Sequence, residues 1–410
     1  MANATILLTG ATGFIGGATL AHLLETRPDC RLLILARGDD PSVAALRVQQ
    51  SLGRFVDLKS MAGPLLSCWV VPGDLTDPEC LSDERLGAAV RLGEQPAGAA
   101  VQSSIRDAPS RDADAASICH GGDPPRLDDV THVLHLASNT SFRSVRGVRH
   151  TNILGTLTLA HRLRRVAGLQ RFLFVSTAYL CGDIRNSVVA EDDSPQYGRK
   201  HIVEYTNSKA ECELLLANTA PELPLVVARP SVVVGHTQFG CLPSASLFWF
   251  YRTVDLLRRY TRPLDTREDV VPVDYVARAL VFLLFQSDLR HRCYHISAGH
   301  GSCVTWHEIV RVFAQCYGDR PENPWKIVDF ATIERERDRL RPLLGPGDED
   351  HLLMALRLYF QFSALDVEIF DNSRLLAEGM PAPPKFTDYL QLCATQPPGR
   401  SVYDQMRDDE

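Results

Sequence analysis

The chain has 410 residues with 45% hydrophobic and 23% charged side chains, enough globular material for one large α/β domain with an appendage or for two to three smaller domains. Its formal net charge is −7, whereas nucleic-acid-binding proteins typically carry an excess of basic residues, so no nucleic-acid partner is expected. Its 11 cysteines are odd in number and include no Cys-x-x-Cys pair, which argues against a disulfide framework and a zinc cluster and predicts free thiols with no bound metal.

The N-terminal sequence MANATILLTGATGFIGG has no basic region ahead of its apolar run, which Thr9 and Gly10 interrupt, so we predict no secretion signal. A membrane span requires roughly 20 uninterrupted apolar residues, and no stretch of the chain offers them. The nearest, ARALVFLLF at 277–285, has the length of a buried helix. We therefore expect a cytoplasmic protein with no membrane span.

Short apolar runs alternate with helix-like segments through the first half of the chain. Near-continuous apolar runs such as RFLFVS are typical of strands buried on both faces of a sheet. The predicted strands cover 5–9, 31–36, 67–71, 132–137, 171–176 and 225–228, and the predicted helices cover 15–26, 151–166 and 205–218. This alternation predicts an α/β fold with a doubly wound parallel sheet of the Rossmann-like type.

Residues 87–128 interrupt the alternation, because they are rich in Ala, Gly, Pro, Asp and Arg and lack clear periodicity. Compact domains rarely carry so long a structureless connection. We interpret the segment as a surface insertion, partly disordered, between the third and fourth strands. A nucleotide-binding domain is accordingly predicted over 1–235, with 270–298 returning to it.

The pattern becomes more helical after about residue 236. The segment VTWHEIVRVFAQCY carries a capping box, with Thr305 at the cap and Glu308 three residues later. Further helices are predicted over 332–359, interrupted near LLGPGDED. Residues 236–410 are thus expected to form a smaller, mostly helical substrate-binding and C-terminal part.

A glycine-rich turn follows the first predicted strand. Glycines at such a turn permit a tight bend and let a pyrophosphate approach the N-terminus of the next helix, where free N–H groups favour an anion. The spacing is G-x-x-G-x-x-G rather than G-x-G-x-x-G, but its place between a strand and a helix strengthens the prediction. The predicted dinucleotide-binding loop comprises Gly10, Thr12, Gly13, Phe14, Ile15 and Gly16.

The end of the second predicted strand indicates which dinucleotide binds. A cofactor with a free 2′-hydroxyl usually meets an acid about 20 residues past the loop, whereas a 2′-phosphate meets an arginine. The strand RLLILA ends at Arg37, and no acid occurs before Asp39 and Asp40. An ordinary surface arginine also fits this position, but we favour the phosphate role and therefore NADPH.

Other strand ends supply further candidate cofactor contacts. Asp74 and Leu75 in VVPGDL follow the third strand, where a carboxylate could accept the adenine amino group, although a helix N-cap explains Asp74 equally well. Ala137 and Ser138 in HLAS end the fourth strand with side chains small enough to leave room for a cofactor. Pro230 in ARPS would set backbone near the nicotinamide, and a structural turn explains it as well.

Candidate catalytic residues follow the fifth predicted strand. RFLFVSTAYLCGD brings Ser176 and Thr177 to the carboxyl end of the strand, the edge where open α/β sheets bind ligands. Tyr205 and Lys209 stand four residues apart, on one face of the predicted helix. Because a nearby ammonium favours a phenolate, we expect Lys209 to lower the pKa of Tyr205.

The order of these motifs resembles the extended short-chain dehydrogenase/reductase family, whose elements are represented here by TGATGFIG, GDL, HLAS, TNILGT, VSTAYLCG, YTNSK and ARPSVVVG. VVPGDLTDPECLSDE, VVPVDYVARAL and IFDNSRLLAEG are similar to the branch of fatty acyl-CoA reductases and carrier-protein thioester reductases. The resemblance covers most of the chain outside 87–128 and parts of 240–360. The insertion and the short second half depart from that branch.

This resemblance implies a role for each catalytic candidate. Thr177 would hydrogen-bond the substrate carbonyl, Tyr205 would donate a proton to it, and Lys209 would also hold the nicotinamide ribose. Hydride from NADPH would convert an acyl thioester to a hemithioacetal, which loses the thiol to leave an aldehyde. A second reduction to the alcohol, and the choice between acyl-CoA and a carrier-protein thioester, stay open.

Two competing functions share parts of the pattern. A nucleotide-sugar epimerase or dehydratase uses the same loop and Tyr/Lys pair but keeps its nicotinamide bound, and Arg37 argues against it. A non-catalytic dinucleotide sensor would not require Thr177, Tyr205 and Lys209 together. A homodimer is the default expectation for the oligomeric state.

Two features can be interpreted either as purely structural or as part of the active site. Asn152 could support Lys209 through water, but a helix N-cap is favoured. The aromatic run 248–251 could line an acyl tunnel, but core packing is favoured.

Overall fold

The computed structural model describes residues 4–94, 122–141, 144–182, 188–340, 349–365 and 367–407. An eight-stranded sheet lies at its centre, in the order β13-β8-β6-β5-β1-β2-β3-β4. All neighbouring strands in it run parallel except β3 and β4. The strands are β1 (Thr5–Thr9), β2 (Arg31–Ala36), β3 (Cys68–Pro72), β4 (Val90–Arg91), β5 (His132–His135), β6 (Arg171–Val175), β8 (Leu225–Pro230) and β13 (Cys293–Ile296).

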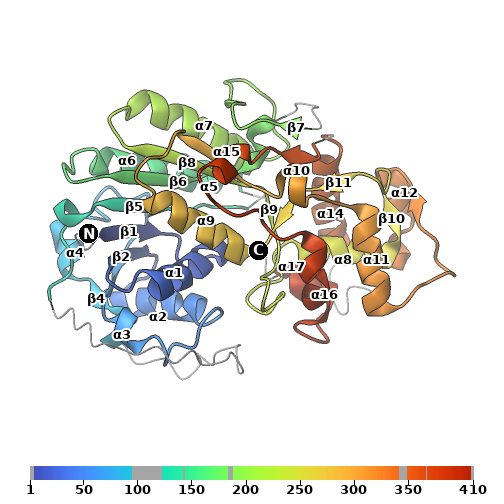
Figure 1. Cartoon of the computed structure of the whole chain (residues 1–410), viewed down its shortest axis with the longest axis horizontal. Helices are drawn as coiled ribbons and strands as arrows, with labels where there is room; N and C mark the ends of the chain where they lie inside the picture. Colours follow the sequence, from blue (N-terminus) through green and yellow to red (C-terminus); the bar gives the residue numbers. More distant parts are fainter. Residues whose placement is uncertain are drawn as a thin grey trace.

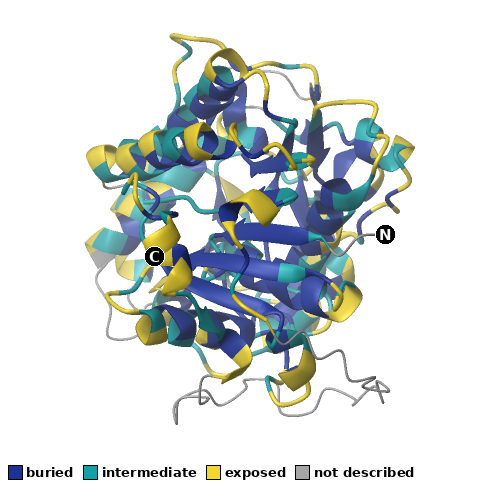
Figure 2. Ribbon diagram, turned by 90° about the vertical axis from the view of Figure 1, so that its left-hand side faces the viewer, coloured by how far each residue is buried: buried dark blue, intermediate teal, exposed yellow. Residues whose placement is uncertain are grey.

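Helices cover both faces of this sheet (Figure 1). On one face lie α1 (Phe14–Thr26), α2 (Pro41–Leu52) and α9 (Val273–Phe285), and on the other α6 (Thr156–Leu163) and α7 (Glu204–Thr219). Alternate strand residues serve alternate faces, because side chains of a strand point to opposite sides. Leu8 packs with the first helix layer and Leu7 with the second. The predicted doubly wound fold is confirmed, and Figure 2 shows its strands buried between helices with exposed outer faces.

The six predicted strands agree with the observed ones to within two residues at each end, but two strands of this sheet were not predicted. β4 and β13 are short, and β4 lies inside 87–128, so the beginning of that segment is a sheet edge rather than structureless chain. Of the predicted insertion, residues 95–121 lie outside the described residues, and the described end of it, 122–128, leads into the short helix η2 (Leu127–Asp129). β13 pairs with β8 and α9 packs on α1, so both ends of 270–298 contact the sheet domain. The domain boundaries themselves stay predictions.

The predicted helix 151–166 begins earlier than expected. α5 (Val145–Arg149) continues through a π-helical turn, η3 (His150–Gly155), into α6. The cap is Ser144, whose hydroxyl accepts a hydrogen bond from the Gly147 backbone N–H. The helix α2 was not predicted, although Asp40 caps it and Pro41 opens it, a combination typical of a helix start.

Beyond the sheet, helices form a second core of their own. The predicted capping box of Thr305 and Glu308 is confirmed at the start of α11. Trp249 and Trp306 are almost completely buried at the centre of this core. Within the described residues, no helix combines the length and apolarity needed to cross a bilayer. The helices are α8 (Phe248–Leu257), α11 (Trp306–Tyr317), α12 (Phe330–Arg335), α14 (Glu349–Ser363), α16 (Phe386–Thr395) and α17 (Val402–Arg407).

Two-stranded pairs link these segments to one another and to the sheet domain. The parallel pairs are β7 (Val188–Val189) with β16 (Ile369–Phe370), β9 (Val232–Val233) with β12 (Val270–Val271), and β10 (Arg259–Tyr260) with β15 (Lys326–Ile327). The antiparallel pair is β11 (Arg267–Glu268) with β14 (Val304–Thr305). Because β7 and β16 lie about 180 residues apart, the C-terminal part returns to the segment that follows β6.

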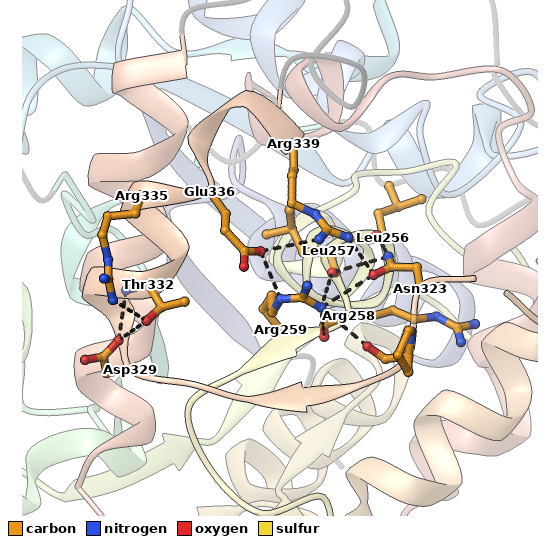
Figure 3. A network of polar contacts seen from close by, with 11 residues as sticks. Leu256, Leu257, Arg258, Arg259, Asn323, Asp329, Thr332, Arg335, Glu336 and Arg339 are labelled. Carbon is orange, nitrogen blue, oxygen red and sulfur yellow. Dashed lines mark hydrogen bonds and ion pairs between the residues drawn. The ribbon is translucent and has the colours of Figure 1, made fainter. Parts of the chain in front are cut away.

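A polar network around Arg259 holds the outer end of the helical part together (Figure 3). The Arg259 guanidinium is buried, with its Nε 2.9 Å from Glu336 Oε2 and its Nη1 3.0 Å from the Arg258 carbonyl oxygen. Arg339 donates to Asn323 Oδ1 in the same network. Removing one partner of a buried ion pair leaves an uncompensated charge.

We expect Glu336→Gln to lower the free energy of unfolding by about 2 kcal/mol, less than a fully buried pair would because the Glu336 side chain is 32% exposed. Urea unfolding measures this change. Glu322→Gln, on the exposed surface, removes the same charge and should leave stability within about 0.5 kcal/mol of the wild type. Equal effects of the two variants would contradict the structural role of the ion pair.

Candidate active site

A cavity of about 590 Å³ opens at the carboxyl edge of the parallel strands. β1 and β5 are neighbours whose connections lead to opposite sides, so the cavity lies at the switch point where open α/β sheets bind ligands. Its wall continues to α8 and α14 of the helical part. The sequence-predicted residues that line it are Gly10, Thr12, Gly13, Phe14, Ile15, Gly16, Ser138, Thr177, Tyr205, Lys209 and Pro230; Arg37, Asp74, Leu75 and Ala137 do not.

Two positions of the glycine loop require glycine because a side chain there would clash with the protein's own backbone. Gly10 has a φ of 78°, and a Cβ there would come within 2.6 Å of the Ala137 nitrogen. A Cβ on Gly16 would clash with the Gly10 carbonyl oxygen. Gly13 differs, because its φ is −86° and a Cβ there would meet nothing closer than 3.5 Å. Gly13 also caps α1 without a side chain, so the first-turn N–H groups of this helix are available to an anion.

The contrast between Gly13 and Gly16 gives a prediction. Gly13→Ala should leave the free energy of unfolding within about 0.5 kcal/mol of the wild type, while Gly16→Ala should lower it by about 1–3 kcal/mol. If a pyrophosphate approaches the loop, the Gly13→Ala methyl group meets it, and dinucleotide affinity falls. Urea unfolding and fluorescence titration measure the two quantities. Unchanged dinucleotide affinity of the Gly13→Ala variant would contradict binding at this loop.

Arg37 and Asp74 follow β2 and β3, two neighbouring parallel strands, so they lie at the same carboxyl edge of the sheet as the cavity. Arg37 is exposed, and Arg47 of α2 donates to its carbonyl oxygen over 3.2 Å. Partial burial alone would raise the pKa of Asp74, but hydrogen bonds from Thr76 and the charges of Arg37 and His150 lower it. Asp74 Oδ1 accepts from the Thr76 backbone N–H and hydroxyl in a turn, and no helix starts there, so the N-cap alternative is wrong.

Three further residues near the glycine loop or the strand ends contribute to packing or to the charge of the site. Leu75 is buried, and a Cβ on Gly155 of η3 would lie 3.0 Å from the Leu75 Cβ. Ala137 packs its backbone against Gly10. Arg54, which follows α2, lines the cavity next to the glycine loop and was missed from the sequence. No sequence motif marks Arg54, because it lies in the turn after the end of α2 at Leu52.

Lys209 is buried beneath the cavity, with 2% of its surface exposed. Its ammonium donates to the Val175 carbonyl oxygen over 2.8 Å and lies 4.7 Å from the centre of the Phe174 ring. Burial lowers the pKa of Lys209 to about 8, although the neighbouring Cys212 and Glu213 favour its charged form. Lys209 is therefore a cation that loses its proton close to the physiological range.

Tyr205 lines the same cavity in the first turn of α7. Burial raises the pKa of Tyr205 to about 12. The expectation that Lys209 lowers this pKa is wrong for this structure, because the ammonium is directed to the Val175 carbonyl and desolvation dominates. A phenol with so high a pKa keeps its proton at neutral pH, which is the form that donates.

Asn152 connects the two halves of the site. Its Oδ1 accepts from the Ser138 hydroxyl and the Asn139 backbone N–H, and its Nδ2 donates to the Ser208 hydroxyl over 2.9 Å. The favoured N-cap interpretation is wrong, since Asn152 lies in the middle of the continuous helix formed by α5, η3 and α6. It fixes α7, and with it Tyr205 and Lys209, against the loop that follows β5.

Thr177 follows β6 by two residues and is 7% exposed. Its hydroxyl accepts a long hydrogen bond, 3.3 Å, from the Tyr179 backbone N–H, which leaves its proton available to another acceptor. The adjacent Ser176 hydroxyl is buried and has no hydrogen-bond partner among the described residues. A substrate oxygen between Thr177 and Tyr205 could accept from both hydroxyls.

The substrate end of the cavity is aromatic. Of the run 248–251, Phe248 and Trp249 pack in the second core, while Phe250 and Tyr251 also line the cavity, so core packing and cavity lining share the run. Residues of this end that the sequence did not single out as site residues are Tyr179, Arg262, Glu268, Tyr359 and Phe362.

A doubly wound sheet, a glycine loop at its switch point and a Thr, Tyr and Lys set in one cavity define an extended short-chain dehydrogenase/reductase. The chain belongs to the NAD-binding family described as "Male sterility protein", whose model matches residues 8–89 and 125–280. That membership confirms the resemblance in the sequence, and it makes the protein an oxidoreductase that binds a nicotinamide cofactor.

Relatives and solved structures agree with this placement. The chain is 23% identical over 384 residues to "Probable fatty acyl-CoA reductase 5" of Arabidopsis thaliana, covering 78% of this chain and 71% of that protein. It is 25% identical over 406 residues to "Aldehyde reductase lnaA" of Aspergillus flavus, covering 93% of this chain but only 34% of that protein. The terminal R domain of the myxalamid PKS-NRPS pathway superposes with a TM-score of 0.70 at 20% identity, covering 96% of this chain and 90% of that domain.

Proposed function

We propose that this protein reduces an acyl thioester to an aldehyde with NADPH. The observation that carries the proposal is that Thr177, Tyr205, Lys209 and the glycine loop line one cavity, which continues into an aromatic wall beyond the catalytic residues. Named relatives include a fatty acyl-CoA reductase and an aldehyde reductase, which supports this reaction class. The assay described below compares acyl-CoA with carrier-protein thioesters, and it measures whether the aldehyde is reduced further to the alcohol.

The residues present fit a nicotinamide dinucleotide. Gly10 and Gly16 bring backbone close together where a Cβ would intrude, and the uncapped N-terminus of α1 favours a pyrophosphate. In our proposal the six residues of the glycine loop, from Gly10 to Gly16 without Ala11, hold the pyrophosphate. Asp74 and Leu75 border the adenine, and Lys209 holds the nicotinamide ribose beside Ala137, Ser138 and Pro230. The cofactor supplies the hydride.

Side chains of the protein bind the thioester carbonyl oxygen and supply the proton that it receives. Thr177 and Tyr205 donate hydrogen bonds to the thioester carbonyl oxygen, where negative charge develops during reduction. Tyr205 then gives its proton to that oxygen, and the resulting hemithioacetal releases the thiol to leave the aldehyde. Asn152 positions α7 through Ser208, so it acts on Tyr205 and Lys209 without touching substrate.

Arg37 decides between NADPH and NADH in this proposal. Arg37→Ala should weaken NADPH binding about 10- to 100-fold, because a charge-assisted contact to the 2′-phosphate is lost, and should leave NADH binding unchanged. Fluorescence titration of both dinucleotides checks this. Arg165→Ala, an exposed position after α6 on the other face of the sheet, is the matched control. Equal weakening of both dinucleotides would contradict 2′-phosphate recognition.

One assay separates the candidate functions. NADPH absorbance is followed with the purified protein and long-chain acyl-CoA, then with acyl carrier-protein thioesters, and aldehyde and alcohol are trapped and quantified. Stoichiometric loss of NADPH with release of thiol supports the reductase. Interconversion of a UDP-sugar without net loss of NADPH would instead identify an epimerase or dehydratase. NADPH binding with no turnover of either substrate class would identify a dinucleotide sensor.

Light scattering of the same sample tests the expected homodimer.

A further inference from the structure

Tyr179 lines the substrate end of the cavity. It lies in the short helix η4 (Ala178–Cys181), which follows Thr177 directly. Its backbone N–H donates to the Thr177 hydroxyl, and its ring packs edge-on against Phe362 and Phe370, with ring centres 5.5 Å and 4.9 Å away. The turn that carries the proposed carbonyl-binding residue therefore also fixes the place of this phenol.

The charged groups of this end have partners within the protein. The carboxyl group of Glu268 accepts hydrogen bonds from the side chains of Tyr251, Tyr260 and Trp306. Arg262 has its Nη2 3.3 Å from Glu368 Oε1. The Tyr179 hydroxyl, in contrast, makes no hydrogen bond to any residue that the structure describes.

The Tyr179 hydroxyl is a donor that keeps its proton. Burial raises the pKa of Tyr179 well above its ordinary value, and the charges of Glu268 and Asp269 raise it further. The residue is half-buried and lines the cavity, so a bound acyl group would reach it. A protonated phenol donates one hydrogen bond, and the cavity offers this donor to a substrate acceptor.

A plain alkyl chain is a poor neighbour for this donor. It would displace water from the Tyr179 hydroxyl without offering an acceptor, and a buried polar group without a partner is costly. An acyl group with a hydroxyl, ether or carbonyl oxygen would replace that water. Phenylalanine would make the same ring contacts with Phe362 and Phe370, so packing does not account for the hydroxyl.

We propose that Tyr179 selects acyl thioesters whose acyl group carries an oxygen acceptor. The proposal rests on the thioester reductase function, and it narrows the substrate class from plain fatty acyl chains to oxygenated acyl chains. Because Thr177 and Tyr179 share one turn, a hydrogen bond from Tyr179 to the acyl group also helps to hold the thioester carbonyl at Thr177.

The test compares CoA thioesters of similar chain length: octanoyl, 3-hydroxyoctanoyl, 5-oxaoctanoyl and 7-oxaoctanoyl. The two oxa compounds replace a methylene group by an ether oxygen, which accepts a hydrogen bond but cannot donate one. We expect kcat/KM for at least one oxygenated substrate to exceed that for octanoyl by about 10-fold or more, since a site built to hydrogen-bond a substrate group discriminates against analogues that lack it. Octanoyl-CoA reduced as well as every oxygenated substrate would overturn the proposal.

Tyr179→Phe keeps the ring and removes only the hydroxyl. It should bring kcat/KM for the preferred oxygenated substrate and for octanoyl to within about 2-fold of each other. Tyr197→Phe, the same change at an exposed position outside the cavity, is the matched control and keeps the wild-type preference. Retention of the preference by Tyr179→Phe would overturn the proposal.

A binding measurement separates failure of this inference from failure of the reductase function and does not depend on a folded variant. The thioether counterparts of the four substrates cannot be reduced, and their dissociation constants for the wild-type protein with NADPH are measured by calorimetry. Tighter binding of an oxygenated thioether than of octyl-CoA supports selection by Tyr179 even if no thioester is turned over. Octyl-CoA bound as tightly as every oxygenated thioether overturns this selection even if thioesters are reduced.

Discussion

Tyr205→Phe should lower kcat for thioester reduction by about 10²- to 10⁴-fold, the range expected when a general acid is lost. The phenol keeps its proton at neutral pH because burial raises its pKa to about 12, so the wild-type residue is a donor throughout the working range. Phenylalanine fills the same space without that proton. Stopped-flow measurement of NADPH oxidation at saturating substrate gives the change in kcat.

Tyr197→Phe is the matched control, because this tyrosine is 65% exposed and does not line the cavity. It should leave kcat within a factor of about two. NADPH affinity of the Tyr205→Phe variant should also stay close to that of the wild type, which separates loss of the proton donor from loss of cofactor binding. A Tyr205→Phe variant with full kcat would remove this residue from the mechanism.

The parts of the site that depend on local sequence could be predicted. Gly10 and Gly16 are needed for backbone geometry within one turn, and the strand ends carrying Arg37 and Thr177 follow from runs of apolar residues. Each predicted strand begins and ends within two residues of the observed one for the same reason. Periodicity is a local property, and the sheet places all carboxyl ends at one edge.

The parts that depend on tertiary packing could not be predicted. Spacing placed Tyr205 and Lys209 on one helix face, but it could not show that Lys209 would be buried against Val175 and Phe174, which reverses the expected pKa effect. Asn152 looked like a helix cap because the preceding turn of α5 has weak helix formers such as Gly147. Glu268 reaches the cavity through a strand pair with residues about 36 positions away, for which no short motif exists.

The burial of Lys209 leads to the second large effect. Lys209→Met should lower kcat/KM by about 10²- to 10³-fold, the range for losing one preorganised electrostatic contact in an active site. In the wild type, the pKa of about 8 means that the ammonium is present below pH 8 and is lost as the pH rises through this value. The kcat/KM of the wild type should therefore fall above about pH 8. Tyr205, with a pKa near 12, cannot produce this limb.

Stability should move in the opposite direction to activity. The pKa of Lys209 is lowered from 10.5 in the unfolded chain to about 8 in the folded one, so the unfolded state binds more protons between these values and the free energy of unfolding rises with pH there. Below pH 8 the folded protein carries the full cost of a buried ammonium, which Lys209→Met removes. The Lys209→Met variant should consequently be about 10²- to 10³-fold less active yet no less stable at pH 7 in urea unfolding, and the pH profile of its residual activity should lack the limb near pH 8. A large loss of stability on replacing Lys209 would mean that the ammonium is retained for packing, whereas a stable variant of low activity means that it is retained for the reaction.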